Sequence, residues 1–412
     1  MITSLQLKDF KNFADETLRV GPFTVIVGTN ASGKSNIRDA FRVLHGIGRR
    51  YTLAEIIGGK YGAGGQVEWG SIRGAPHEIA NREQESFGLR VELALEERTA
   101  EFAVNIRPKA FGADGFRIGY EKFSVNGQSK YSANYGSNKS ISYYGNFRSC
   151  IDDRHQYLSE WDQPLLTQFV EIPSATGKQI EPVVDMLASM RFLDLVPDRM
   201  RQPSLPGQII LGDGGENLPA VLKALCMDPG KEEVLTQWTR ELTPMDVADF
   251  DFREGPDGKV HLILQEMSGR EISAQSASDG TLRFLAMLAA LLGPDPARLY
   301  FFEEIDNGIH PSRLNLLIDL IEQQTAKGEV QVVATTHSPQ LLSMIGDSTF
   351  ENTSVVCRLE DAEDAVIRRI AGLPNVKELR KSQGLGRLLA GGWMETALAF
   401  TEEDKKNAKD SE

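Results

Sequence analysis

A short segment rich in glycine and small polar residues, GTNASGKS at residues 28–35, fits the phosphate-binding pattern G-x-x-x-x-G-K-[ST]. The glycines let backbone N–H groups turn toward phosphate oxygens, and the helix expected to follow adds the positive end of its dipole. Lys34 can reach the β- and γ-phosphates, and the Ser35 hydroxyl can ligate magnesium. The alternative is a glycine turn with a solvated lysine, but the place of the segment between a strand and an amphipathic helix favours phosphate binding. The predicted nucleotide-binding residues are Asn30, Ala31, Ser32, Gly33, Lys34, Ser35 and Asn36.

Two adjacent carboxylates, Glu303 and Glu304, end an apolar run at residues 299–302. If that run is a buried parallel strand, the first carboxylate lies at the carboxyl edge of the sheet, beside the magnesium ion. The second can polarise an attacking water as a general base. A strand followed by a charged loop is the alternative. Together with the glycine loop, the pair predicts a metal ligand at Glu303 and a catalytic base at Glu304.

Two further motifs carry weaker signals. His337 follows another apolar run, where it can touch the γ-phosphate or hydrogen-bond to the water or its base. The alternative for His337 is a structural role at a strand end. Residues 278–281 (SDGT) open a helix whose free N–H groups can bind an anion. A plain capped helix is the alternative there.

The elements that must hold these residues alternate between strand and helix. An apolar, β-branched run at 23–27 predicts a buried parallel strand, and helically spaced apolar residues over 34–45 predict the helix after the glycine loop. Strands at 299–302 and 330–335, joined by a helix over 314–324, predict a βαβ crossover. The sequence therefore predicts an α/β P-loop NTPase with a mostly parallel sheet.

Other segments surround this core. Alternating patterns at 87–104 and 116–125 predict an antiparallel β lobe, and the glycine-rich stretch 57–74 predicts an exposed loop. Residues 150–245 look helical but are broken by prolines. Because they contain no sustained heptad repeat, we expect no long coiled-coil arm. The expected domains are an N-terminal ATPase lobe, a lid-like helical insertion, a C-terminal ATPase lobe and a charged, disordered tail, at residues 1–150, 151–250, 251–400 and 401–412.

Composition limits the classes of partner. The 412 residues carry a formal net charge of -13, so any contact with DNA must come from a local basic patch. Arg42, Arg49, Arg50, Arg199 and Arg201 are candidates, although a solvated surface charge is the favoured interpretation of each. Three scattered cysteines predict neither disulfides nor a zinc ribbon, and we expect no signal peptide and no membrane span. The expected location is the cytoplasm.

The order of these motifs resembles that of ABC-type ATPases of the RecF and SMC kind. The likeness is to stand-alone AAA family ATPases related to the overcoming-lysogenization-defect proteins. The opening LQLKDFKNF at 5–13 and GTNASGKSN at 28–36 look like their first strand pair and Walker A motif. The segments SDGTLR at 278–283, FEEIDNGIHP at 302–311 and THSP at 336–339 are similar to their signature, Walker B with D-loop, and switch histidine. Weaker likenesses lie at 214–222 and 384–391.

The resemblance implies an ABC-type ATPase head that binds ATP and Mg²⁺. Lys34 would bind phosphate, Glu304 would be the catalytic glutamate and His337 the switch. Ser278 and Gly280 would cap the γ-phosphate of an ATP held by the other subunit of a head-to-tail homodimer. The chain departs from the family at Glu303, where an aspartate is usual.

The Q-loop glutamine has only two candidates, Gln163 and Gln168. The leading functional hypothesis is an ATPase whose dimerisation acts on DNA or on a partner effector such as a nuclease, in DNA repair or phage defence. The chain itself shows no Toprim-like acidic cluster after residue 345. One alternative is a nucleotide-sensing clamp with little turnover, which the Glu303 departure motivates. Another is the nucleotide-binding subunit of a membrane transporter, which the poor match to the transporter signature disfavours.

Overall fold

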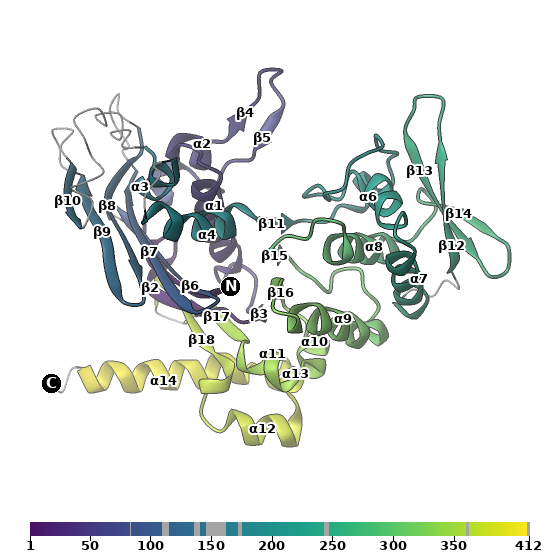
Figure 1. Ribbon diagram of the computed structural model, residues 1–412. Coiled ribbons are helices and arrows are strands. Elements are labelled where there is room, and N and C mark those ends of the chain that lie inside the picture. The colour runs from purple at the N-terminus through teal and green to yellow at the C-terminus, as the bar shows by residue number, and fades with distance from the viewer. Residues whose placement is uncertain are drawn as a thin grey trace.

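Two large sheets with helices around them make up the molecule (Figure 1). The computed structural model describes residues 1–82, 84–108, 115–135, 141–145, 162–171, 175–242, 247–359 and 362–409. Within these residues, no helix combines the length and the apolar character needed to cross a membrane.

The central sheet has the order β11-β15-β16-β3-β17-β18. Five strands run parallel, and β18 is an antiparallel edge strand. The strands are β3 (Phe23–Val27), β11 (Met190–Leu193), β15 (Leu299–Phe302), β16 (Gln331–Thr336), β17 (Ser354–Arg358) and β18 (Ala365–Arg369). The expected parallel sheet is therefore confirmed, as are the predicted strand at 23–27 and the crossover between β15 and β16.

Side chains of the central sheet are buried on both faces. Along β15, Leu299 and Phe301 belong to one apolar cluster, whereas Tyr300 and Phe302 belong to another. A strand with no solvated face needs an unbroken apolar run, because successive side chains point to opposite sides. This is why the sequence LYFF reads as a buried strand and ends where the first charged residue, Glu303, reaches the edge.

One face of the central sheet is covered by the antiparallel lobe and its helices. The lobe has the order β10-β9-β8-β7-β6-β1-β2, with every pair antiparallel. Its strands are β1 (Ile2–Phe10), β2 (Phe13–Arg19), β6 (Phe87–Leu95), β7 (Arg98–Arg107), β8 (Arg117–Val125), β9 (Gln128–Tyr135) and β10 (Ile141–Gly145). Four helices of the described chain join this layer, namely α1 (Lys34–Gly48), α2 (Leu53–Gly58), α3 (Leu165–Gln168) and α4 (Gly177–Ala188). The expected antiparallel β lobe is confirmed.

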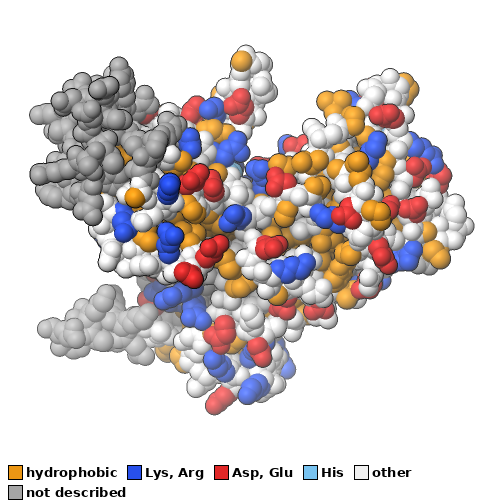
Figure 2. Space-filling model, viewed as in Figure 1, with side chains coloured by type: hydrophobic (Ala, Val, Ile, Leu, Met, Phe, Trp, Pro, Cys, Tyr) orange, Lys and Arg blue, Asp and Glu red, His pale blue; other side chains and the backbone are white. Residues whose placement is uncertain are grey.

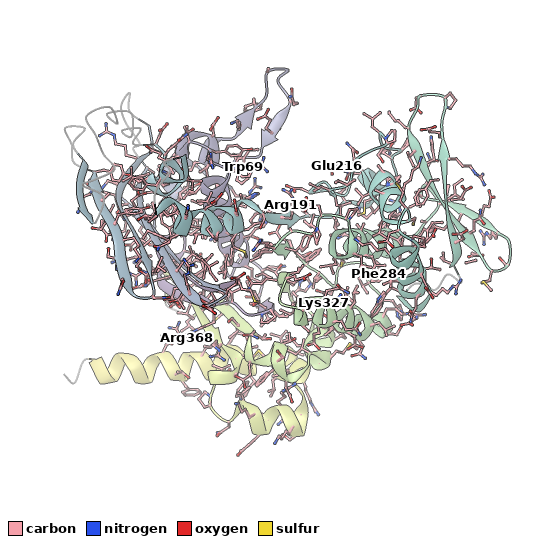
Figure 3. All side chains as sticks on the ribbon, viewed as in Figure 1. Trp69, Arg191, Glu216, Phe284, Lys327 and Arg368 are labelled. Atoms are coloured by element: carbon pink, nitrogen blue, oxygen red, sulfur yellow. The ribbon has the colours of Figure 1, made fainter. Side chains whose placement is uncertain are left out.

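The opposite face is covered mainly by α8 (Asp279–Leu292) and α9 (Leu314–Ala326). Phe284 of α8 lies inside this cluster (Figure 3). Around these two lie a small sheet and further helices: β12 (Val247–Glu254), β13 (Val260–Glu266), β14 (Glu271–Ser273), α5 (Pro197–Met200), α6 (Leu218–Leu225), α7 (Pro229–Leu242), α10 (Pro339–Met344), α11 (Asp347–Glu351), α12 (Val376–Gln383), α13 (Leu385–Ala390) and α14 (Trp393–Lys409).

The structure differs from the sequence-based expectation in three places. Within the segment expected to be helical, residues 190–193 form β11, which pairs with β15 in the central sheet. The expected loop over 57–74 contains a hairpin of β4 (Lys60–Tyr61) and β5 (Val67–Trp69), which projects from the molecule in Figure 1. Trp69 anchors its base by donating a hydrogen bond from Nε1 to the Ile56 carbonyl at 3.0 Å.

The third difference is the charged tail, which was expected to be disordered. It instead continues α14 as far as Lys409. The segment is rich in glutamate and lysine, which have high helix propensity. Arg368 of β18 also ties this helix to the sheets, because its guanidinium binds Glu402 at 2.6 Å and Glu16 of β2 at 2.5 Å (Figure 3).

Glu121 of β8 is completely buried in the antiparallel lobe. Burial raises the pKa of its carboxyl from 4.5 to about 8, against hydrogen bonds from the Leu165 backbone and from Tyr131 and Tyr135. The folded protein therefore keeps this proton to higher pH than the unfolded chain does. As a result, the free energy of unfolding falls as the pH rises from about 4.5 to about 8.

Replacing Glu121 with glutamine should remove this fall in the free energy of unfolding with rising pH, because an amide does not titrate. We expect the free energy of unfolding of Glu121→Gln to depend less on pH between about 5 and 8 than that of the wild type. Urea denaturation at a series of pH values measures this, with the exposed Glu92→Gln as the matched control. Parallel pH curves for Glu121→Gln and wild type would contradict the assignment.

Candidate nucleotide-binding site

The glycine loop joins the carboxyl end of β3 to α1, as the sequence predicts. Gly33 has φ 118°, in the left-handed region that favours glycine. A Cβ at Gly28 would lie 2.1 Å from the Val356 carbonyl oxygen, so only glycine fits there. The turn between β1 and β2 supports the loop, because Asn12 donates from Nδ2 to the Ser32 carbonyl at 3.1 Å and accepts from Asn36 at 2.7 Å.

Lys34 is folded back over its own loop. Its ammonium donates to the carbonyls of Gly28 at 2.6 Å and Thr29 at 2.8 Å. Burial lowers the pKa of Lys34, and the nearby Glu304 carboxylate opposes that shift. Within the described residues the hydrogen-bond partners of this partly desolvated ammonium are neutral carbonyls, so an arriving phosphate supplies a charge-assisted partner.

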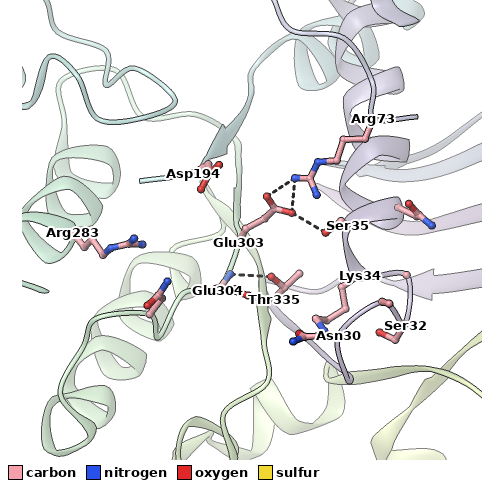
Figure 4. Close-up of a pocket in the computed structure, with 14 residues that line it drawn as sticks. Asn30, Ser32, Lys34, Ser35, Arg73, Asp194, Arg283, Glu303, Glu304 and Thr335 are labelled. Carbon is pink, nitrogen blue, oxygen red and sulfur yellow. Dashed lines mark hydrogen bonds and ion pairs between the residues drawn. The ribbon is translucent and has the colours of Figure 1, made fainter. Parts of the chain in front are cut away.

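Glu303 stands at the end of β15 and is held by three groups (Figure 4). Arg73 binds both of its oxygens, at 3.0 and 2.7 Å. Ser35 donates from Oγ to Oε1 at 3.2 Å, and Arg38 lies 3.7 Å from Oε2. Lys11 fixes the backbone of Arg73 by donating to its carbonyl at 2.8 Å. The carboxylate is therefore directed at the glycine loop, where the sequence expects it.

Glu304 adopts an unusual backbone conformation. Its φ is 47°, in the left-handed region, and its N–H donates to Thr335 Oγ1 at 3.0 Å. A non-glycine residue there costs free energy, and such residues concentrate at functional sites. This turn directs the two carboxylates differently. Glu303 accepts a hydrogen bond from Ser35, whereas the Glu304 side chain is exposed in the pocket.

A pocket of about 390 Å³ brings most of the predicted residues together. It contains the whole predicted loop, residues 30–36, together with Glu303 and Glu304. Five further lining residues were not predicted by the sequence analysis: Arg73, Asp194, Arg283, Asn307 and Thr335. Figure 4 shows Arg73, Asp194 and Arg283 reaching the pocket from different elements. Arg283 and Asn307 lie inside the signature and D-loop segments, where other residues were singled out, whereas Arg73 and Asp194 lie in segments without a motif.

Three predicted residues do not line this pocket. His337 is exposed just after β16, and Ser278 caps α8 by accepting a hydrogen bond from the Thr281 N–H at 3.1 Å. Gly280 lies against the Gly308 carbonyl. Both glutamine candidates also lie elsewhere, since Gln163 donates to the Arg50 carbonyl and Gln168 to the Gln163 carbonyl. The roles predicted for these residues remain predictions.

Gly280 has a structural constraint of its own, which yields a prediction. A Cβ there would lie 2.2 Å from the Gly308 carbonyl oxygen. We expect Gly280→Ala to lower the free energy of unfolding by about 1–3 kcal/mol, because the helix and the loop must separate. Urea denaturation tests this, with Gly58→Ala as control because its Cβ would meet nothing within 4 Å. Equal stability of Gly280→Ala and wild type would contradict the close contact.

The donor set of the pocket fits magnesium. The Ser35 hydroxyl and the Glu303 carboxylate are hard oxygen ligands, and Ser35 Oγ lies 3.2 Å from Glu303 Oε1. Magnesium is usually bound by one or two carboxylates together with waters and substrate phosphates. It therefore needs no preformed cage, and the described residues contain no group of three His, Cys, Asp or Glu that could hold a metal.

The fold and the pocket together define a P-loop NTPase with a mostly parallel central sheet. A glycine loop follows β3, a pair of carboxylates follows β15, and β16 lies between these two strands in the sheet. All these groups lie at the carboxyl ends of parallel strands, which is the ligand-binding edge of an open α/β sheet.

Comparison with known proteins gives the family. Residues 23–343 match the family described as "AAA domain, putative AbiEii toxin, Type IV TA system". The chain belongs to this family. It is also similar to a Helicobacter pylori (strain ATCC 700392 / 26695) protein named "ATP/GTP phosphatase", at 29% identity over 103 residues. That match covers 23% of this chain and 27% of the relative.

Solved structures of SMC head domains are also similar to this chain, at low sequence identity. The SMC head domain from Thermotoga maritima has 12% identity and a TM-score of 0.44, covering 90% of this chain and 98% of that one. The Smc head domain with an extended coiled coil bound to the C-terminal domain of ScpA, from Pyrococcus furiosus, has 14% identity and a TM-score of 0.41. In that case 89% of this chain and 95% of the other are covered.

Proposed function

We propose that this protein binds ATP with Mg²⁺ in the pocket and hydrolyses it. The observation that carries the proposal is that one pocket is lined by Lys34 and Ser35 of the glycine loop and by Glu303 and Glu304 after β15. The chain that forms this pocket belongs to an AAA domain family. The family match supports nucleotide chemistry, and the separate directions of the two carboxylates support a division between binding the metal and activating water.

Each residue has a distinct proposed role. The backbone N–H groups of residues 30–36 surround the phosphates, and Lys34 exchanges its two carbonyl partners for phosphate oxygens. Ser35 and Glu303 hold the Mg²⁺ ion, which neutralises charge on the phosphates when bound. Glu304 accepts a proton from the attacking water. His337, exposed after β16, contacts the γ-phosphate or the water once the site has closed.

We propose further that ATP joins two copies head to tail. Ser278 and Gly280 do not line the pocket of their own copy, so the role expected of them requires a second copy. Glu304→Gln with ATP and Mg²⁺ should run as a dimer in size-exclusion chromatography with light scattering, and as a monomer without ATP. Lys34→Ala should stay monomeric. A Glu304→Gln protein that binds ATP but remains monomeric would contradict this part of the proposal.

The regulated ligand is proposed to be DNA or a partner effector, in DNA repair or phage defence. Several candidate arginines are already engaged, since Arg42 lies 4.6 Å from the Trp69 ring centroid and Arg201 binds Asp279 at 2.5 Å. Among the described residues on the face in Figure 2, acidic and basic side chains are interspersed. Both observations favour a protein partner over DNA. Hydrolysis that rises with duplex DNA but not with partner protein would reverse that preference.

A nucleotide-sensing clamp with little turnover is the second candidate. The observation that favours it is Glu303 itself, which replaces the usual aspartate and is bound to two arginines. A clamp would bind ATP tightly yet release phosphate no faster than Glu304→Gln does. Wild-type turnover that is lost in Glu304→Gln excludes it.

A further inference from the structure

A further carboxylate reaches the pocket from β11, the strand that the sequence analysis did not predict. Asp194 directly follows β11 and lines the pocket. Leu193 pairs with Phe302 of the parallel strand β15, so the next residues along the two strands, Asp194 and Glu303, are neighbours. Adjacent strands are about 4.8 Å apart. Figure 4 shows both side chains at the same edge of the sheet.

The two carboxylates differ in what already binds them. Glu303 contacts Arg73, Arg38 and Ser35, so its charge is largely compensated. The Asp194 side chain is exposed and has no hydrogen bond or ion pair within the described part of the chain. Its backbone is fixed, because its N–H donates to the Asp213 carbonyl at 2.9 Å. Asp194 therefore presents an uncompensated carboxylate from a rigid position.

We propose that Asp194 is a second carboxylate ligand of the divalent cation that accompanies the nucleotide, acting beside Ser35 and Glu303. The inference rests on the proposed function, because the cation is the one that arrives with ATP. Magnesium sites at phosphates commonly use one or two carboxylates. Asp194 lines the pocket, whereas neither of the two glutamine candidates, Gln163 and Gln168, does.

A carboxylate in this pocket attracts the cation and repels the phosphates, so Asp194 is expected to bind the cation. Lys34, Arg73 and Arg283 supply positive side chains, and Asp194 adds to the two glutamates on the negative side. Removing Asp194 leaves every phosphate-binding group in place. The loss should therefore lower metal affinity without lowering metal-free nucleotide affinity, because a carboxylate repels the phosphates.

The test uses Mn²⁺ as the probe, with the full chain saturated with ADP. Electron paramagnetic resonance measures free Mn²⁺, and titration calorimetry in EDTA measures ADP binding without metal. We expect Asp194→Asn to weaken Mn²⁺ binding by about 10-fold or more, because even the loss of a group that only hydrogen-bonds to a metal ligand costs about 10- to 100-fold. ADP affinity in EDTA should not fall below the wild-type value, and Asp194→Glu should recover part of the Mn²⁺ affinity.

The matched control is Asp257→Asn, an exposed aspartate on the β12–β13 hairpin outside the pocket. Wild-type Mn²⁺ affinity in Asp194→Asn would overturn the inference while leaving the proposed function intact. An equal loss of ADP affinity in EDTA would also overturn it, because Asp194 would then act on the nucleotide or on the fold. A wild-type protein that binds no ADP would overturn the proposed function instead.

Discussion

Replacing Glu304 with glutamine is expected to lower kcat for ATP hydrolysis by about 10²- to 10⁴-fold, the usual contribution of a positioned general base. An amide cannot accept the proton of the attacking water. Glutamine keeps the length of the side chain, and the N–H of residue 304 can still donate to Thr335 Oγ1. ATP affinity should therefore remain within a few-fold of wild type. Phosphate-release kinetics and equilibrium ATP binding measure the two effects separately.

The control for this variant is Glu329→Gln, an exposed glutamate before β16 that does not line the pocket. It should hydrolyse ATP at the wild-type rate. Turnover by Glu304→Gln at the wild-type rate would remove Glu304 from the mechanism. A parallel loss of ATP affinity would show that Glu304 holds the structure of the pocket and is not a catalytic base.

Replacing Lys34 with alanine should act on binding first. Among the described residues, its ammonium hydrogen-bonds to the Gly28 and Thr29 carbonyls, which a phosphate can replace. A charged hydrogen bond contributes about 1.5–3 kcal/mol, so ATP affinity should fall roughly 10- to 100-fold. Hydrolysis should be lost as well, because Lys34 is expected to bind the phosphate that is cleaved. Titration calorimetry with ATP measures the change in affinity.

Lys60→Ala is the matched control for Lys34→Ala. Lys60 pairs with Glu55 at 3.1 Å in the projecting hairpin and does not line the pocket. Its loss should leave ATP affinity unchanged. If Lys34→Ala bound ATP as tightly as the control variant does, the glycine loop would not be the phosphate site.

The parts of the site that were predicted correctly have signals that are local in sequence. The glycine loop is defined by adjacent residues, and β15 by an apolar run that ends in Glu303. Their meeting follows from the general geometry of parallel sheets, whose strands end at the same edge. This is why the sequence predicts one pocket for residues that lie far apart along the chain.

The missed residues depend on contacts that are distant in sequence. β11 has only four residues, MRFL, and an apolar run of this length can equally belong to a helix. Arg73 lies in a glycine-rich stretch, and its partner Glu303 is 230 positions away along the chain. The division of the chain into domains and the roles of His337, Ser278 and Gly280 stay predictions.

Phosphate release from ATP by the purified wild-type protein tests the central claim most directly. The measurement compares Mg²⁺ with EDTA and includes Lys34→Ala and Glu304→Gln under the same conditions. We predict release that requires Mg²⁺, is lost in Lys34→Ala and falls by about 10²- to 10⁴-fold in Glu304→Gln, with near wild-type ATP affinity retained only by Glu304→Gln. Hydrolysis at the wild-type rate in either variant, or in EDTA, would contradict an ATPase site built from the glycine loop and the two carboxylates after β15.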